Sequence, residues 1–248
     1  MSEEWIKIQS ENSKKIIKYD TFDINDILYI GGLDISFDKT DNTLGCVYLS
    51  VYDNKTKNLI YEDNLMCKMD VPYVSSFLGF REIEHYKLIM NRFFQAYPGS
   101  ENKIIVMVDG NGIYHKREFG SATHLGYDIN ISTIGVSKNI MEIFGITREN
   151  VSNNLKYKNK LKLTKTNGDT IAYALKTGSA TENNPIFVSI GHKISIETAV
   201  RIVNEYIKFK VPEPIRNSDI KSRDILRKLS RWYSYLFIIK IDVDGSFQ

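Results

Sequence analysis

Hydrophobic residues alternate with polar residues, or follow one another in short runs, in three stretches near the start of the chain. These stretches read ILYIGGLDISF from Ile27, CVYLSVYD over 46–53 and LIYEDNLMCKM over 59–69. The segments DKTDNT and DNKTKN between them are rich in turn-forming residues. The pattern predicts three strands in an antiparallel meander, preceded by a polar lead-in over residues 1–26.

The pattern changes to a helical spacing after the meander. From Glu82 to Tyr97 the apolar positions lie three or four residues apart, and PGS ends the run. Later apolar runs predict strands at 103–109 (KIIVMVD), 131–138 (ISTIGVSK), 171–177 (IAYALKT) and 185–193 (PIFVSIGHK), and further helices are predicted at roughly 195–209 and 218–236. Together these elements predict the α/β class, with a mixed sheet and helices on both faces.

Length and composition favour one domain over residues 27–236, with a tail over 237–248. We expect the last stretch, RWYSYLFIIKIDVDGSFQ from Arg231, to form a helix followed by a strand. The chain has 248 residues, 42% hydrophobic and 25% charged. It lacks an apolar run long enough for a membrane helix and an apolar leader, so we expect a soluble protein of the cytoplasm and also the nucleus. Cys46 and Cys67 each lie in a predicted strand, which favours reduced thiols over a disulfide framework.

The net charge of +3 is less informative than its distribution. Four lysines alternate in LKYKNKLKLTK, and KSRDILRKLSR carries Arg223, Arg227, Lys228 and Arg231 on a predicted helix. A solvated face is the usual explanation for each cluster, and contact with phosphates is the alternative.

Three acids stand where acids are costly. Asp34 interrupts an apolar strand, Asp109 ends another at the edge where α/β sheets place their sites, and Glu82 opens a helix. Each has a local explanation, as a turn partner for Asp34, a cap for Asp109 and a favourable helix start for Glu82. Acids that converge from different elements are, however, what an oxygen-ligand site for Mg²⁺ or Mn²⁺ requires.

Other polar residues follow the predicted strands. His192 stands at a strand-to-helix turn, where it either acts on a ligand or packs under the helix. Gly110 and Gly112 permit close approach of a ligand to the backbone, although glycine pairs are common in loops. His115 follows this loop, and Lys138 ends a strand at the same sheet edge, where it either meets a phosphate or is an ordinary terminal lysine.

Several ordered motifs carry a family resemblance. They are GGLDISF, PYVSSFLGFRE, VDGNGIYHKREFGSATHLG, TIGVSK, NPIFVSIGHKISIETAV and VPEPIR, spread from about Leu28 to about Arg223. With these motifs the chain resembles endonuclease V, an inosine-directed nuclease with the ribonuclease H-like fold.

The resemblance implies roles for particular residues. Asp34 and Asp109 would bind the catalytic Mg²⁺, Glu82 would complete the acidic cluster, and His192 would assist the reaction. Tyr73 would be a wedge that stacks among the bases, and Lys138 would contact phosphate. The base pocket would involve Gly110, Gly112, His115, Gly120 and Ser121. The implied reaction hydrolyses the second phosphodiester bond on the 3′ side of inosine and leaves 3′-hydroxyl and 5′-phosphate ends.

The chain departs from bacterial members of the family, which it resembles less than eukaryotic ones. The wedge reads PYVS, with Ser75 where bacterial members have proline, and His115 precedes Lys116 rather than proline. This favours an enzyme that acts on inosine in single-stranded RNA, and we expect the protein to be a monomer. The alternatives are a deoxyinosine-specific DNA repair endonuclease and a non-catalytic protein that binds inosine-containing RNA.

Overall fold

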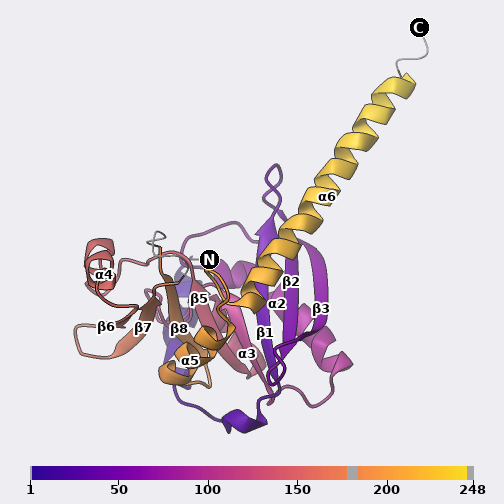
Figure 1. Ribbon diagram of the computed structural model, residues 1–248. Coiled ribbons are helices and arrows are strands. Elements are labelled where there is room, and N and C mark those ends of the chain that lie inside the picture. Colours follow the sequence, from indigo (N-terminus) through magenta and orange to yellow (C-terminus); the bar gives the residue numbers. More distant parts are fainter. Residues whose placement is uncertain (1, 178–183, 245–248) are drawn as a thin grey trace.

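The protein forms one eight-stranded mixed sheet covered by helices on both faces (Figure 1). The structure is a computed structural model that describes residues 2–177 and 184–244. The sheet order is β3-β2-β1-β4-β5-β8-β7-β6, and only the β1/β4 and β4/β5 pairs are parallel. The strands are β1 Tyr29–Phe37, β2 Leu44–Asp53, β3 Leu59–Lys68, β4 Ile104–Asp109, β5 Ser132–Ser137, β6 Lys160–Thr164, β7 Thr170–Leu175 and β8 Ile186–His192.

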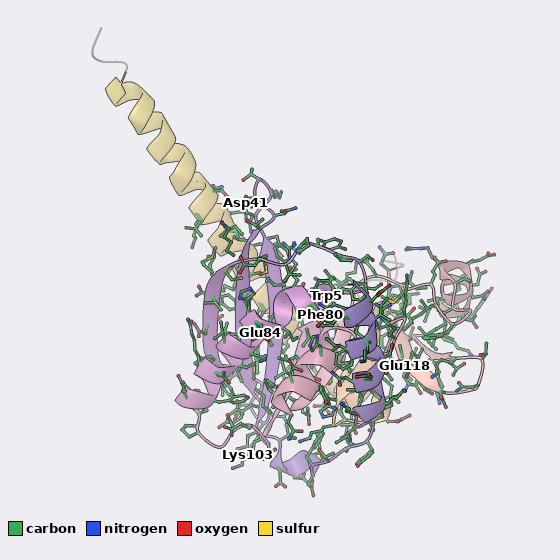
Figure 2. The ribbon with its side chains drawn as sticks, turned by 180° about the vertical axis from the view of Figure 1, so that it is seen from behind. Trp5, Asp41, Phe80, Glu84, Lys103 and Glu118 are labelled. Atoms are coloured by element: carbon green, nitrogen blue, oxygen red, sulfur yellow. The ribbon has the colours of Figure 1, made fainter. Side chains whose placement is uncertain are left out.

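Two helical layers enclose this sheet. Helices α2 and α3 lie on one face, whereas α5 and α6 cover the other, where α6 packs on β1 and β2 (Figures 1 and 2). Helix α1 lies on the α2 side, where the Trp5 ring stacks on Phe80 with centroids 4.9 Å apart. The α-helices are α1 Ser2–Asn12, α2 Leu78–Ala96, α3 Ser121–Ile129, α4 Arg148–Leu155, α5 Ile196–Tyr206 and α6 Glu213–Asp244, with 3₁₀ turns at Ser13–Lys15 and Ile24–Asp26.

The central strands separate two hydrophobic cores. Successive side chains of a strand point to opposite faces, so Leu33 of β1 and Val106 of β4 pack toward Tyr86 of α2. On the other face, Met107 of β4 belongs to the core that contains Tyr206 of α5. By the same alternation, Asp34, Asp109 and Lys138 share the face covered by α6. The strand period therefore brings these three predicted site residues to one side of the sheet.

Short side chains let α6 approach β1 closely. A Cβ atom on Gly32 would lie 2.2 Å from the carbonyl carbon of Pro214, so only glycine fits there. Ser218 forms a hydroxyl pair with Ser50 at 2.8 Å, and Ser222 forms another with Ser36 at 2.8 Å. These contacts fix which residues of α6 overlie the carboxyl end of β1.

The predicted α/β architecture is confirmed, including the antiparallel meander of β1–β3 and a helix that includes Glu82. The boundaries differ in places. Residues 2–12 of the expected lead-in form helix α1, and α2 begins at Leu78, one turn before Glu82. The expected strand in the tail is wrong within the described residues, because α6 continues to Asp244. No proline or glycine interrupts the sequence between Pro214 and Gly245.

Candidate active site

Asp34 and Asp109 lie side by side on adjacent parallel strands. Leu33 of β1 pairs with Val108 of β4, so the next residue of each strand is one of these aspartates. Asp34 is only 6% exposed, and Ser222 of α6 donates a hydrogen bond to its Oδ2 over 3.4 Å. The predicted convergence of these two carboxylates is what the structure shows.

Lys138 and a further aspartate complete this side of the site. The Nζ of Lys138, which follows β5, lies 2.6 Å from Asp109 Oδ2 and 3.5 Å from Asp219 Oδ2. Asp219 stands between Ser218 and Ser222 on α6, and Arg223 Nη2 lies 2.5 Å from its Oδ1. The hydrophobic pattern and the motifs do not single out Asp219. Its signal is the spacing S-D-x-x-S, which puts Asp219 beside two buried serines on a helix that covers the sheet.

Glu82 reaches the site from the opposite layer. It lies in the second turn of α2, it is buried, and Ser121 Oγ at the start of α3 donates to its Oε2 over 3.3 Å. Burial raises the pKa of Glu82 to about 7, and the negative charge of Asp109 adds to that shift. The sequence placed Glu82 at a helix start, whereas the structure places it in a buried position that a carboxylate occupies only at a cost.

The charges around Asp34 indicate what the cluster can hold. Burial raises the pKa of Asp34 well above its usual value, and the charges of Asp109 and Asp219 raise it further. Lys138 opposes this shift and puts a cation between Asp109 and Asp219. Three carboxylates around an ammonium group are a donor set that suits a hard divalent ion such as Mg²⁺. As the side chains stand, no three His, Cys, Asp or Glu residues among those described are arranged to hold a metal.

The loop that contains Tyr73 precedes α2, the helix that carries Glu82. Tyr73 is 65% exposed, which leaves its ring available for stacking. The loop is anchored at Ser76, whose φ is +69° and whose carbonyl oxygen lies within hydrogen-bond distance of Gln9, Arg117 and His115. The structure therefore presents an exposed aromatic ring on a loop that is held in place by hydrogen bonds at Ser76.

His115 is one of the residues that hold the Tyr73 loop in place. Its side chain is buried, and its Nε2 lies 3.0 Å from the Ser76 carbonyl oxygen. Burial and the positive charge of Arg117 lower the pKa of His115 to about 4, so the ring is neutral at pH 7. The resemblance implies a place for His115 in the base pocket, whereas the described contacts make it a positioning residue for the Tyr73 loop.

The glycine positions divide into two kinds. A Cβ on Gly112 would lie 2.0 Å from the Ile190 carbonyl oxygen, and one on Gly120 would lie 2.2 Å from that of Asn111, so both glycines permit tight packing within the protein. A Cβ on Gly110, by contrast, would meet only Ser121 at ordinary contact distance. Among the described residues, the side-chain oxygen of Asn111 is buried without a hydrogen-bond partner.

The structure does not bring His192 to the acidic cluster. Because β8 runs antiparallel to β5, His192 lies beside Thr133 at the start of β5, the end opposite Lys138. Its ring is buried, its Nδ1 accepts a hydrogen bond from the Ile17 N–H over 3.3 Å, and it contacts Tyr127 edge-on. These contacts fit the packing alternative for His192 rather than a role in catalysis.

Two remaining expectations concern the chain as a whole. Cys46 and Cys67 are both buried free thiols, as predicted. Within the described residues, no helix combines the length and the apolar character needed to cross a membrane.

Comparisons with known proteins identify relatives of this chain. The family model for endonuclease V matches residues 10–220. Endonuclease V of Mus musculus is 36% identical over 208 residues, which are 80% of this chain but only 60% of the mouse protein. The chain thus spans less than two thirds of that relative.

Solved structures give the same result. The structure of Ciona intestinalis endonuclease V, in complex with DNA containing an inosine followed by a ribo-adenosine, superposes with a TM-score of 0.84. It is 34% identical, and the match covers 91% of this chain and 98% of that one. For the catalytic domain of human endonuclease V, the TM-score is 0.83, the identity is 29%, and the coverage is 90% and 95%. These matches confirm the ribonuclease H-like fold expected from the sequence.

Proposed function

This chain belongs to the endonuclease V family of nucleases, and from that premise we propose that it cuts single-stranded RNA at the second phosphodiester bond 3′ to inosine. The products would carry 3′-hydroxyl and 5′-phosphate ends. The observation that carries the proposal is the convergence of Asp34, Asp109 and Asp219 around the Lys138 ammonium. Tyr73, on the loop that precedes α2, is exposed.

The acidic cluster would hold the metal ion on which the family generally depends. Asp34, Asp109 and Asp219 offer carboxylate oxygens on the α6 side of the sheet, and Glu82 offers one from the α2 side. Mg²⁺, or Mn²⁺ in its place, supplies charge neutralisation at a phosphate and a lowered pKa for water. The Lys138 ammonium lies among the acids. In this proposal it donates hydrogen bonds to the oxygens of the phosphate that binds there.

Tyr73 and the glycine loop would recognise the base. An exposed tyrosine can stack in the strand where the inosine has been displaced, because every base offers a π face. In this proposal the base lies against the backbone at Gly110, where a side chain would meet only Ser121. Hypoxanthine differs from adenine in a ring N–H and a carbonyl group, so a buried acceptor distinguishes the two bases at the cost of an unmade hydrogen bond.

The preference for RNA rests on the wedge and on the relatives. Ser75 follows Tyr73 and Val74 in the PYVS pattern that favours the eukaryotic branch. The DNA bound to the Ciona intestinalis protein has a ribo-adenosine after its inosine, so that complex includes a ribose on the 3′ side. Since the remainder of that strand is DNA, cleavage of deoxyinosine-containing DNA is the second candidate function.

A direct test uses matched single strands of RNA and DNA with one inosine or one adenosine at the same position. We expect Mg²⁺-dependent cleavage of the inosine strands only, at a higher rate for RNA than for DNA. The cut should map to the second phosphodiester bond 3′ to inosine. Asp109→Asn should abolish cleavage, whereas the matched variant Asp224→Asn on exposed α6 should retain it. Faster cutting of DNA would replace the RNA preference by the second candidate. Cleavage that survives Asp109→Asn would refute the site assignment.

A further inference from the structure

A groove leads from the acidic cluster along the first turns of α6. It has a volume of about 900 Å³ and runs between α6 and the turn that joins β1 to β2, the hairpin whose tip carries Asp41 in Figure 2. At one end it is lined by Asp34, Asp109, Lys138 and Asp219. The groove is therefore continuous with the candidate active site and gives a strand bound there a path to follow.

The wall beyond the acids is basic. It contains Lys39 of the β1–β2 turn and Arg223, Arg227 and Arg231 of α6, against a single acid, Asp38. The three arginines stand four residues apart, so they follow one face of the helix at intervals of about 6 Å. A row of cations on one wall of an open groove is suited to the backbone of a single nucleic-acid strand.

The present partners of these arginines are easily exchanged. Arg223 pairs with Asp219 and Arg227 with Asp224, each at 2.5 Å, but their side chains are 59% and 65% exposed. Exposed ion pairs contribute little stability, so phosphates can replace these carboxylates at small cost. Asp38 is held by Thr40 and by Ser230 Oγ, which donates to its Oδ2 over 2.8 Å. This contact ties the β1–β2 turn to α6.

The two sides of the active site assign a direction to the strand. The Tyr73 loop and Glu82 approach from the α2 layer, whereas the groove opens on the α6 layer. If the inosine lies at the Tyr73 loop and the cut lies on its 3′ side at the acids, then the strand beyond the cut leaves along α6. We propose that this groove binds the phosphates 3′ of the cleaved bond. The inference rests on the proposed function.

The three arginines lie outside the segment that the family model matches, which ends at residue 220. The basic wall that α6 contributes is therefore outside the matched segment, whereas the acids at the other end of the groove lie within it. The length of the groove along Arg223–Arg231 is about 12 Å, enough for roughly two or three nucleotides.

The experiment keeps the inosine and the 5′ flank constant and lengthens the 3′ flank from two to twelve nucleotides. For the wild type we expect KM to fall as the 3′ flank reaches the groove and then to level off, with kcat unchanged. The double variant Arg227→Ala/Arg231→Ala should keep kcat and lose this dependence, with KM on the long strand rising about tenfold. The slope of log KM against log salt should decrease by about 0.7 for each contact removed. Lys228→Ala removes a cation from the same helix that does not line the groove, and it should behave as the wild type.

The outcomes separate this inference from the proposed function. The groove assignment alone is overturned if cleavage depends on inosine but KM does not change with the length of the 3′ flank, or changes with the 5′ flank instead. Absence of any inosine-dependent cleavage overturns the proposed function. In that case the affinity of labelled oligonucleotides, measured by fluorescence anisotropy without Mg²⁺, still tests whether the groove binds the strand. Equal binding by the double variant and Lys228→Ala overturns it, and weaker binding by the double variant supports it.

Discussion

Asp219 is the residue that changes the description of the site most. The sequence presents it as one acid in a charged helix, yet it shares Lys138 with Asp109 and contributes to the raised pKa of Asp34. His192, which shares a motif with the family, lies at the other end of the sheet. A motif match identifies which segments correspond, whereas the strand direction decides which side chains meet.

We expect Asp219→Asn to lower kcat/KM for inosine strands by about 100-fold or more, because the substitution removes a charged oxygen ligand at the metal site. The measurement is Mg²⁺-dependent cleavage by protein whose circular dichroism matches the wild type. Asp224→Asn, five residues along the same helix, is the control and should cost less than about threefold. Wild-type rates for Asp219→Asn would remove this residue from the site.

The lowered pKa of His192 predicts how the stability of the protein depends on pH. Burial lowers its pKa from 6.5 to about 4 in the folded protein, so between these values the unfolded chain binds more protons than the folded one. The stability contributed by the neutral ring is complete above pH 6.5 and is lost as pH falls toward 4, at up to about 1.4 kcal/mol per pH unit. Urea unfolding of His192→Gln should show a shallower loss over this range than the wild type. Tyr127→Phe alters the ring beside His192 but keeps the histidine, so it should keep the wild-type slope.

At the scale of elements, the sequence predicted the sheet better than the helices. Apolar runs such as KIIVMVD give the position of a strand that is buried on both faces, and the strand ends then bring Asp34 and Asp109 together. Helix α1 escaped prediction because it packs through Trp5 and the buried Gln9, which form no apolar stripe. Helix α3 was hidden among the small and polar residues of a loop-like motif, and the contacts that stabilise it are distant in sequence.

The packing of α6 on β1 gives a prediction at this scale. Gly32→Ala should destabilise the protein by about 1–3 kcal/mol, because the new methyl group would displace α6 at Pro214. The shift would also move Asp219 and reduce cleavage about tenfold or more. Gly31→Ala, one residue earlier, meets its neighbours at 3.4–3.6 Å and should cost less than about 1 kcal/mol. Equal effects of the two substitutions on unfolding and activity would show that the close approach of α6 is not what fixes the site.

For the whole molecule, the active site joins three layers. Asp34 and Asp109 come from the sheet, Glu82 from the α2 layer and Asp219 from the α6 layer, so the site exists only when both layers are packed. An ion that binds these groups binds the folded protein and not the unfolded chain, and it must stabilise the entire domain.

Mg²⁺ should therefore raise the melting temperature of the wild type. Saturation at about 100 times Kd contributes about 2.7 kcal/mol, and each kcal/mol raises the melting temperature by about 2–4 °C in a domain of this size. Asp109→Asn should lose most of the increase, whereas Asp224→Asn should keep it. The measurement is calorimetry with NaCl at matched ionic strength as the reference. An equal increase in Asp109→Asn would mean that Mg²⁺ acts elsewhere.

The stacking of Trp5 on Phe80 gives the protein an optical reporter of its own. The indole also contacts Phe77, the residue after Ser76, so its emission depends on how the Tyr73 loop is seated. The chain has only one other tryptophan, Trp232. With Trp232 replaced by phenylalanine, the intrinsic fluorescence of a single indole would follow, in real time and without a label, how the loop responds when a strand binds.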